Sequence, residues 1–161
     1  MNKKLVLNIV AAVGFVALVV GLFLNVWQMG ATFMGQTMSE GLGVFAEKAG
    51  MDAGWLGTIA EVAMVLVAVC ALAYVVLFVL DACKVVSLPK VQKLLAIVTL
   101  ALTALVVVCG IVFCILTTNQ IVGGEPLPAG YSMGFGPAIG FYLVAVGALV
   151  AGVAGLLANR K

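Results

Sequence analysis

The sequence predicts an all-α integral membrane protein, a four-helix bundle with two loops on the outer side. Of its 161 residues, 65% are hydrophobic and only 9% are charged, whereas soluble domains carry about 25% charged residues. The hydrophobic residues also gather into four runs, at about 5–27, 55–83, 93–117 and 138–158. A helix of about 20 apolar residues crosses a bilayer core. We therefore expect a single membrane domain, 1–161, whose surroundings are the lipid bilayer. The net charge of +2 comes without a basic cluster that would indicate nucleic acid.

The first run, 5–27, follows two lysines, as the core of a signal peptide also does. A signal core has about 7–15 apolar residues, and this run has 23, which favours a membrane span. Gly14 and Gly21 are seven residues apart and share one helix face. Small residues let a neighbouring helix approach closely, so both are candidates for a helix-packing or oligomer interface.

The second run is bounded by Trp55 and Lys84. As a helix it is about 43 Å long, which matches a bilayer with its headgroup zones at about 40–45 Å. Glu61 lies about 9 Å below Trp55 and is the candidate ion or proton site, because carboxylates inside membranes often mark such pathways. The alternative is a structural role near the interface, with Asn25, Gln28, Thr117 or loop amides as partners. Asp81 is expected to pair with Lys84.

The first loop, 28–53, permits two structures. Met34, Met38, Leu42 and Phe45 recur at helical spacing, which favours a short amphipathic helix on the membrane surface. An extended hairpin is the alternative. Methionine can bind Cu(I), but no His or Cys accompanies these residues, so hydrophobic contact is favoured and no cofactor is predicted.

The third run, 93–117, carries a stripe of small and weakly polar residues on one helix face. Close packing, with hydroxyls bonded to the helix's own carbonyls, is favoured over one wall of a pathway. The stripe consists of Thr99, Thr103, Gly110, Cys114 and Thr117.

The second loop, 119–137, contains Gly and Pro residues that impose turns and prevent a long helix. The fourth run follows it and is the richest in glycine. Gly147, Ala151 and Gly155 are spaced by four, a pattern for close helix contact. Gly140, at the start of this run, belongs to the same candidate interface.

The basic residues predict the orientation. Seven lie at one set of span ends, and only Lys48 lies at the other. Basic residues favour the cytoplasmic side, so we expect cytoplasmic termini, both longer loops outside, and a location in the plasma (inner) membrane. The seven are Lys3, Lys4, Lys84, Lys90, Lys93, Arg160 and Lys161.

The two hairpins of the predicted bundle show some likeness to each other. When residues 66–84 are placed over residues 143–161, nine of the nineteen positions are identical. A parallel duplication of a two-span unit would explain this likeness.

The familiar catalytic constellations are missing from the sequence. It contains no His and no C-x-x-C pair, which removes imidazole metal sites, Cys-His nucleophile pairs and the usual thiol oxidoreductases. The glycines fit no phosphate-binding loop. We therefore expect a protein that is not an enzyme.

The motif Gly140-Phe141-Tyr142-Leu143, followed by small residues, resembles the start of the fourth span of claudin-like tetraspan proteins. The four spans, the cytoplasmic ends and the longer first outer loop are also similar to that family. The family's outer-loop Gly-Leu-Trp motif with paired cysteines is absent. The resemblance implies lateral self-association and formation of a junction or pore.

Taken together, these patterns predict a non-enzymatic membrane protein that self-associates or binds partners through its outside loops. One alternative is a small cation or proton channel or transporter that uses Glu61. Another is an accessory subunit of a larger membrane complex.

Overall fold

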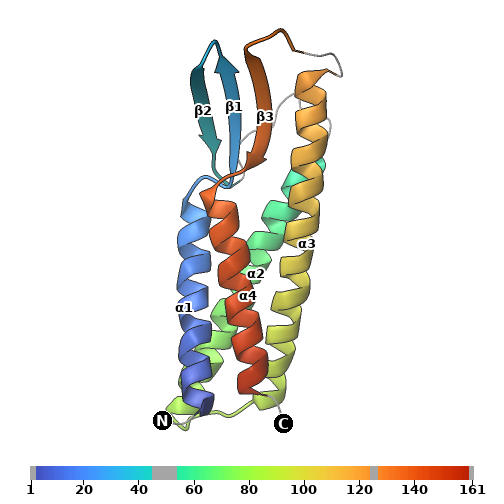
Figure 1. Cartoon of the computed structure of the whole chain (residues 1–161). Coiled ribbons are helices and arrows are strands. Elements are labelled where there is room, and N and C mark those ends of the chain that lie inside the picture. Colours follow the sequence, from blue (N-terminus) through green and yellow to red (C-terminus); the bar gives the residue numbers. More distant parts are fainter. Residues whose placement is uncertain (1–2, 45–53, 124–126, 160–161) are drawn as a thin grey trace.

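The computed structural model describes residues 3–44, 54–123 and 127–159. Within these ranges the chain forms four long helices and one small sheet (Figure 1). The helices are α1 (Lys3–Phe23), α2 (Gly54–Ala82), α3 (Pro89–Val122) and α4 (Ile139–Ala158). The strands are β1 (Trp27–Phe33), β2 (Gln36–Leu42) and β3 (Tyr131–Pro137).

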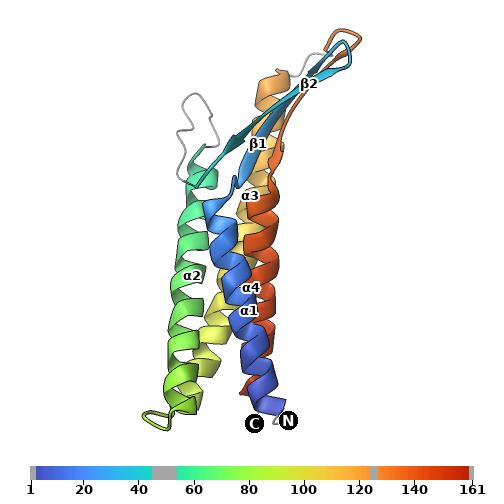
Figure 2. The ribbon, with the colours of Figure 1, turned by 90° about the vertical axis from the view of Figure 1, so that its left-hand side faces the viewer.

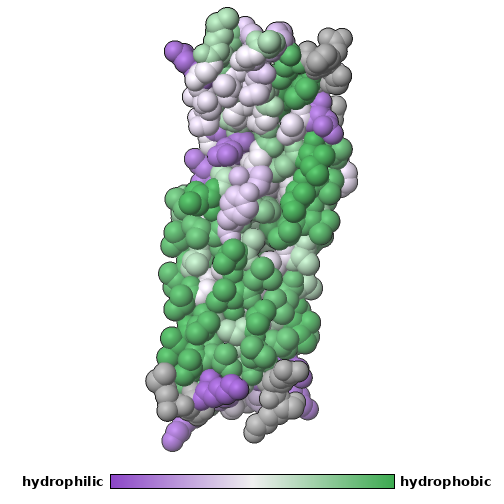
Figure 3. Space-filling view, in the orientation of Figure 1, coloured by the Kyte–Doolittle hydropathy of each residue, from purple (hydrophilic) through white to green (hydrophobic). Residues whose placement is uncertain are grey.

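All four helices are long and apolar enough to cross a membrane. The space-filling view shows a hydrophobic band between two more hydrophilic ends (Figure 3). The bounds agree with the predicted runs for α2 and α4, but α1 ends at Phe23 and α3 extends from Pro89 to Val122. Pro89 starts α3 because a first-turn proline lacks only an N–H that has no helical partner anyway, and Gly123 ends it in the left-handed conformation (φ 66°).

The expected all-α fold is wrong in one respect, because the segment between α1 and α2 and the segment between α3 and α4 both contribute to a sheet. Strands β1 and β2 form an antiparallel hairpin, and β3 pairs with the other side of β1, in the order β2-β1-β3. The amphipathic helix predicted through Met34, Met38 and Leu42 is therefore wrong, and the alternative hairpin is confirmed. Met34 (φ 45°) and Gly35 (φ 83°) make a two-residue turn whose twist suits paired strands. Phe45 lies outside the described residues.

The pairing of β1 with β3 continues into the pairing of α1 with α4. Trp27 is opposite Pro137 at the base of the sheet. Below that pair, the Ala138 N–H donates to the Val26 carbonyl and the Gly140 N–H donates to the Asn25 carbonyl, both at 2.9 Å. The two segments α1–β1 and β3–α4 thus form one long antiparallel unit (Figure 2), with the sheet fixed directly to two helices.

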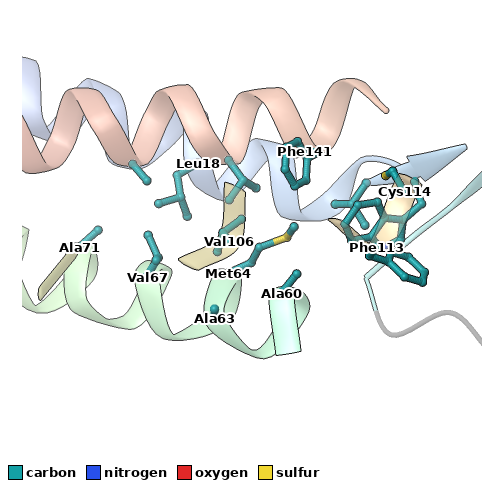
Figure 4. Close-up of a cluster of buried hydrophobic side chains, with 14 of the residues drawn as sticks. Leu18, Ala60, Ala63, Met64, Val67, Ala71, Val106, Phe113, Cys114 and Phe141 are labelled. Atoms are coloured by element: carbon teal, nitrogen blue, oxygen red, sulfur yellow. The ribbon is translucent and has the colours of Figure 1, made fainter. Parts of the chain in front are cut away.

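The core lies between the four helices and under the sheet. Leu18 from α1, Met64 from α2, Val106 from α3 and Phe141 from α4 all belong to one buried cluster (Figure 4). Because every helix contributes a buried face, the four apolar segments pack as one bundle rather than as separate spans.

The start of α1 and the end of α4 lie at the end of the bundle opposite the sheet, beside the link between α2 and α3 (Figure 1). At this end Asp81 pairs with Lys4 of α1, with 2.9 Å between Nζ and Oδ2. The expected ion pair between Asp81 and Lys84 is wrong. Helix α2 ends at Ala82, and Lys84 has φ 58° while its N–H donates to the Asp81 carbonyl. Lys84 therefore does not occupy the helical position one turn after Asp81.

Candidate functional site

Glu61 lies fully buried at the level where the bundle meets the sheet. The Nε1–H of Trp27 donates to Glu61 Oε1 at 2.7 Å, and both side chains are 0% exposed. Glu61 comes from the second turn of α2, and Trp27 is the first residue of β1. The bond therefore joins the second helix to the base of the sheet, and it satisfies an indole N–H that would otherwise be buried without an acceptor.

The sequence singled out Glu61 but not Trp27. Two of the expected partners, Asn25 and Gln28, flank Trp27 in the chain. The apolar run predicts a helix up to residue 27, whereas α1 ends at Phe23 and β1 begins at Trp27, so the side chain that reaches Glu61 is a different one. The available signal was the position of a tryptophan at the outer end of an apolar run, where aromatic residues gather.

Trp27 is surrounded by three phenylalanine rings from three other elements. The ring centroids lie 5.1 Å from Phe113, 5.4 Å from Phe141 and 6.2 Å from Phe135. Gly110 makes room for this cluster, because a Cβ there would collide with the Phe141 ring. The Glu61 carboxyl group is thus held in a tightly packed, largely aromatic setting.

The polar stripe of α3 faces the bundle interior. The Thr99 hydroxyl donates to the Leu95 carbonyl at 2.8 Å, and the Thr103 hydroxyl donates to the Thr99 carbonyl at 2.7 Å. These two hydroxyls are therefore satisfied by their own helix. Cys114 and Thr117 are also buried, and Thr117 Oγ1 has no hydrogen-bond partner among the described residues.

The glycines of the candidate interface lie between α1 and α4 of the same chain. A Cβ at Gly14 would lie 2.7 Å from the Gly147 carbonyl and from the Ala151 nitrogen. A Cβ at Gly21 would lie 2.8 Å from the Gly140 carbonyl. We call Gly14, Gly21, Gly140 and Gly147 the glycine seam. It brings the backbones of α1 and α4 into contact, which glycine permits because it has no side chain. Gly155 instead faces the ring of Tyr74, at 3.0 Å from a Cβ placed there.

A second buried polar group lies near the basic end of the bundle and was not predicted from the sequence. The Tyr74 hydroxyl donates to Asn8 Oδ1 at 2.6 Å, and Asn159 Nδ2 donates to the Tyr74 oxygen at 3.2 Å. The three residues come from α1, α2 and the end of α4. Sequence patterns could not pair them, because the three residues lie in three different segments and periodicity within one segment does not indicate a partner in another.

The sheet has two chemically different faces. Side chains alternate along a strand, and directly paired residues share a face. The strand register therefore puts Met29, Phe33, Met38, Tyr131 and Met133 on one face. Gln36 and Glu40 of β2 lie on the same face, and so do Trp27 and Phe135 at its buried base. The first five side chains are all at least 37% exposed, and the rings of Phe33 and Tyr131 contact each other with centroids 4.6 Å apart. We call these five residues the apolar sheet face.

The opposite face of the sheet is polar and contains several glycines. It carries a shallow hollow of about 400 Å³ whose lining includes Gln28, Thr32, Thr37 and Ser132. Thr32 and Thr37 share a hydrogen bond across the hairpin at 3.3 Å. The exposed apolar side chains of the three strands therefore lie on one face of the sheet.

No protein-family model matches the chain, and a search of curated proteins found no match.

Proposed function

We propose that this protein works by self-association through its outer sheet and is not an enzyme. The observation that carries the proposal is the apolar sheet face, which lies beyond the ends of α1 and α4. In that position its methionine and aromatic side chains are not covered by the packed helices. Exposed apolar patches outside a lipid-facing region are typical of protein–protein contact sites, and methionine and aromatic residues are enriched in such contacts.

The edges of the sheet support the same proposal. Thr118 of α3 covers the outer edge of β3, because its hydroxyl accepts from the Phe135 N–H at 3.1 Å and donates to the Phe135 carbonyl at 2.9 Å. Strand β2 has β1 as its strand neighbour among the described elements. The backbone groups on its outer edge are thus available to another strand, and a second copy offers one of matching length.

The glycine seam favours the sheet over the helices as the contact surface. The close-packing residues of α1 and α4 are used within one chain. Association through helices would need a different surface.

The test compares Met38→Glu with Thr37→Glu in the purified protein in nanodiscs or mild detergent. The two positions are neighbours on β2 but point to opposite faces. We expect wild type and Thr37→Glu to form oligomers, and Met38→Glu to be monomeric. Met38 lies in the cross-strand row Met38–Ala31–Met133, which has no polar residue, so a carboxylate there would be desolvated in the contact. Oligomeric state is measured by native mass spectrometry. A monomeric wild type, or equal association of both variants, contradicts the proposal.

A further inference from the structure

The end of the bundle opposite the sheet contains a pocket of about 510 Å³. It lies where the start of α1, the start of α3 and the end of α4 meet. Its lining includes three lysines and two uncharged polar residues: Lys4, Lys90, Lys93, Ser87 and Asn159. We call it the basic pocket.

The charge of this pocket is positive. Lys4 pairs with Asp81, whereas no described carboxylate forms an ion pair with Lys90 or Lys93. The other two acidic residues that the structure describes are remote from it: Glu40 on β2 and Glu61 below the sheet. Two lysine charges are therefore left to attract an anion.

The start of α3 adds to this positive potential. Leu88, at the N-cap, makes no side-chain hydrogen bond to the first turn, and Pro89 follows it. The first turn of a helix presents backbone N–H groups and the positive end of the helix dipole. Pro89 and Lys90 both line the pocket, so an anion there would meet the helix end as well as the lysines.

One observation favours a lipid headgroup over a free phosphate ion. Ile97 lies one turn beyond Lys93 on the same side of α3 and is 46% exposed, so acyl chains can lie along the helix above a bound headgroup. Asn159 Nδ2 donates to Tyr74 and to the Gly155 carbonyl, while its buried Oδ1 accepts no hydrogen bond from any described residue. Once a small movement opens that oxygen to the pocket, a headgroup hydroxyl can donate to it; protonated inorganic phosphate can do the same, so this contact suits a hydroxyl-bearing ligand without separating the two.

We propose that the basic pocket binds an anionic phospholipid whose headgroup carries hydroxyls, from the leaflet on that side of the membrane. The lysines and the start of α3 hold the phosphate, and Asn159 accepts from the headgroup. Basic pockets between membrane helices are suited to such lipids.

The experiment titrates the full-length protein in detergent with phosphatidylglycerol or phosphatidylcholine and counts bound lipids by native mass spectrometry. The variants are Lys90→Gln/Lys93→Gln and the control Lys84→Gln, which removes a charge at the same end but outside the pocket lining. We expect one phosphatidylglycerol to bind to the wild type at least tenfold more tightly than phosphatidylcholine. Loss of two lysines should weaken it roughly tenfold to thirtyfold, and Lys84→Gln should change it less than twofold.

Three results would overturn this assignment. Equal binding of the two lipids removes the anion site, and equal weakening by Lys84→Gln indicates diffuse surface charge. Displacement of the lipid by an equal concentration of inorganic phosphate indicates a free-anion site instead. The salt dependence of wild-type binding needs no variant: phosphatidylglycerol affinity must fall as salt rises, and a constant affinity contradicts the proposal. None of these results depends on association through the sheet.

Discussion

At the scale of single residues, the bond between Glu61 and Trp27 has the greatest consequences. A carboxyl group inside an apolar bundle is costly unless it is hydrogen-bonded. Here it accepts from an indole N–H at 2.7 Å, among side chains that are almost completely buried. This geometry favours the structural role of Glu61, in which it joins α2 to the base of the sheet, over a role in ion transport.

Replacement of Glu61 tests the structural role. Glu61→Gln keeps an oxygen that can accept from Trp27, so we expect a small loss of thermal stability. Glu61→Leu leaves the indole N–H without that acceptor, which costs about 1–3 kcal/mol of unfolding free energy. Glu40→Gln, on the exposed strand β2, is the control and should melt like the wild type.

The variant Glu61→Gln also distinguishes the structural role of Glu61 from its role in a channel or transporter. We expect wild-type protein in liposomes to show no cation or proton flux above that of empty liposomes. A wild-type flux that disappears in Glu61→Gln, while assembly is unchanged, would show that the carboxylate handles ions.

At the scale of elements, the glycine seam fixes how α1 meets α4. Small residues repeat on both helices, so the two backbones touch, and the strands that follow α1 and precede α4 begin side by side. The seam thereby sets the start of the β1–β3 pairing. A change in the seam should therefore affect the sheet as well as the bundle.

The seam is tested by Gly147→Leu, with Val146→Leu as the control. A Cβ at position 147 would lie 2.6 Å from the Gly14 carbonyl and from the Leu18 nitrogen, so the helices must separate. Val146 is 57% exposed on the outside of the bundle. We expect Gly147→Leu to lose at least about 2 kcal/mol of stability and Val146→Leu to lose little, as measured by thermal unfolding. Equal melting temperatures would place the seam outside the packed interior.

At the scale of the whole molecule, polarity is arranged along the long axis of the bundle. The sheet lies at one end, and the described lysines lie at or beside the helix ends at the other. An apolar band separates the two ends (Figure 3). Because basic residues favour the cytoplasmic side, this arrangement predicts that the sheet faces the outside of the cell and the basic pocket faces the cytoplasm.

Cysteine labelling of intact cells tests that orientation. Cys83 is exposed at the basic end, and Glu40 lies on β2. We expect a membrane-impermeant maleimide to label Glu40→Cys but not the wild type, and to label Cys83 only after the membrane is permeabilised. Labelling of the wild type in intact cells would reverse the topology.

The sequence by itself determined the membrane spans, and the tertiary structure decided what lies between and beside them. Span length follows from the rise of a helix and the thickness of a bilayer, both of which act on contiguous residues. The glycine pattern likewise indicated close-packing faces, because spacing along one helix is local. The sheet, by contrast, pairs Trp27 with Pro137, and the contacts of Glu61 with Trp27 and of Asp81 with Lys4 also join residues far apart in the chain. Periodicity describes one segment at a time, so it does not indicate which strand or side chain will be the partner of a strand or a carboxylate. Those partners depend on how the four helices pack.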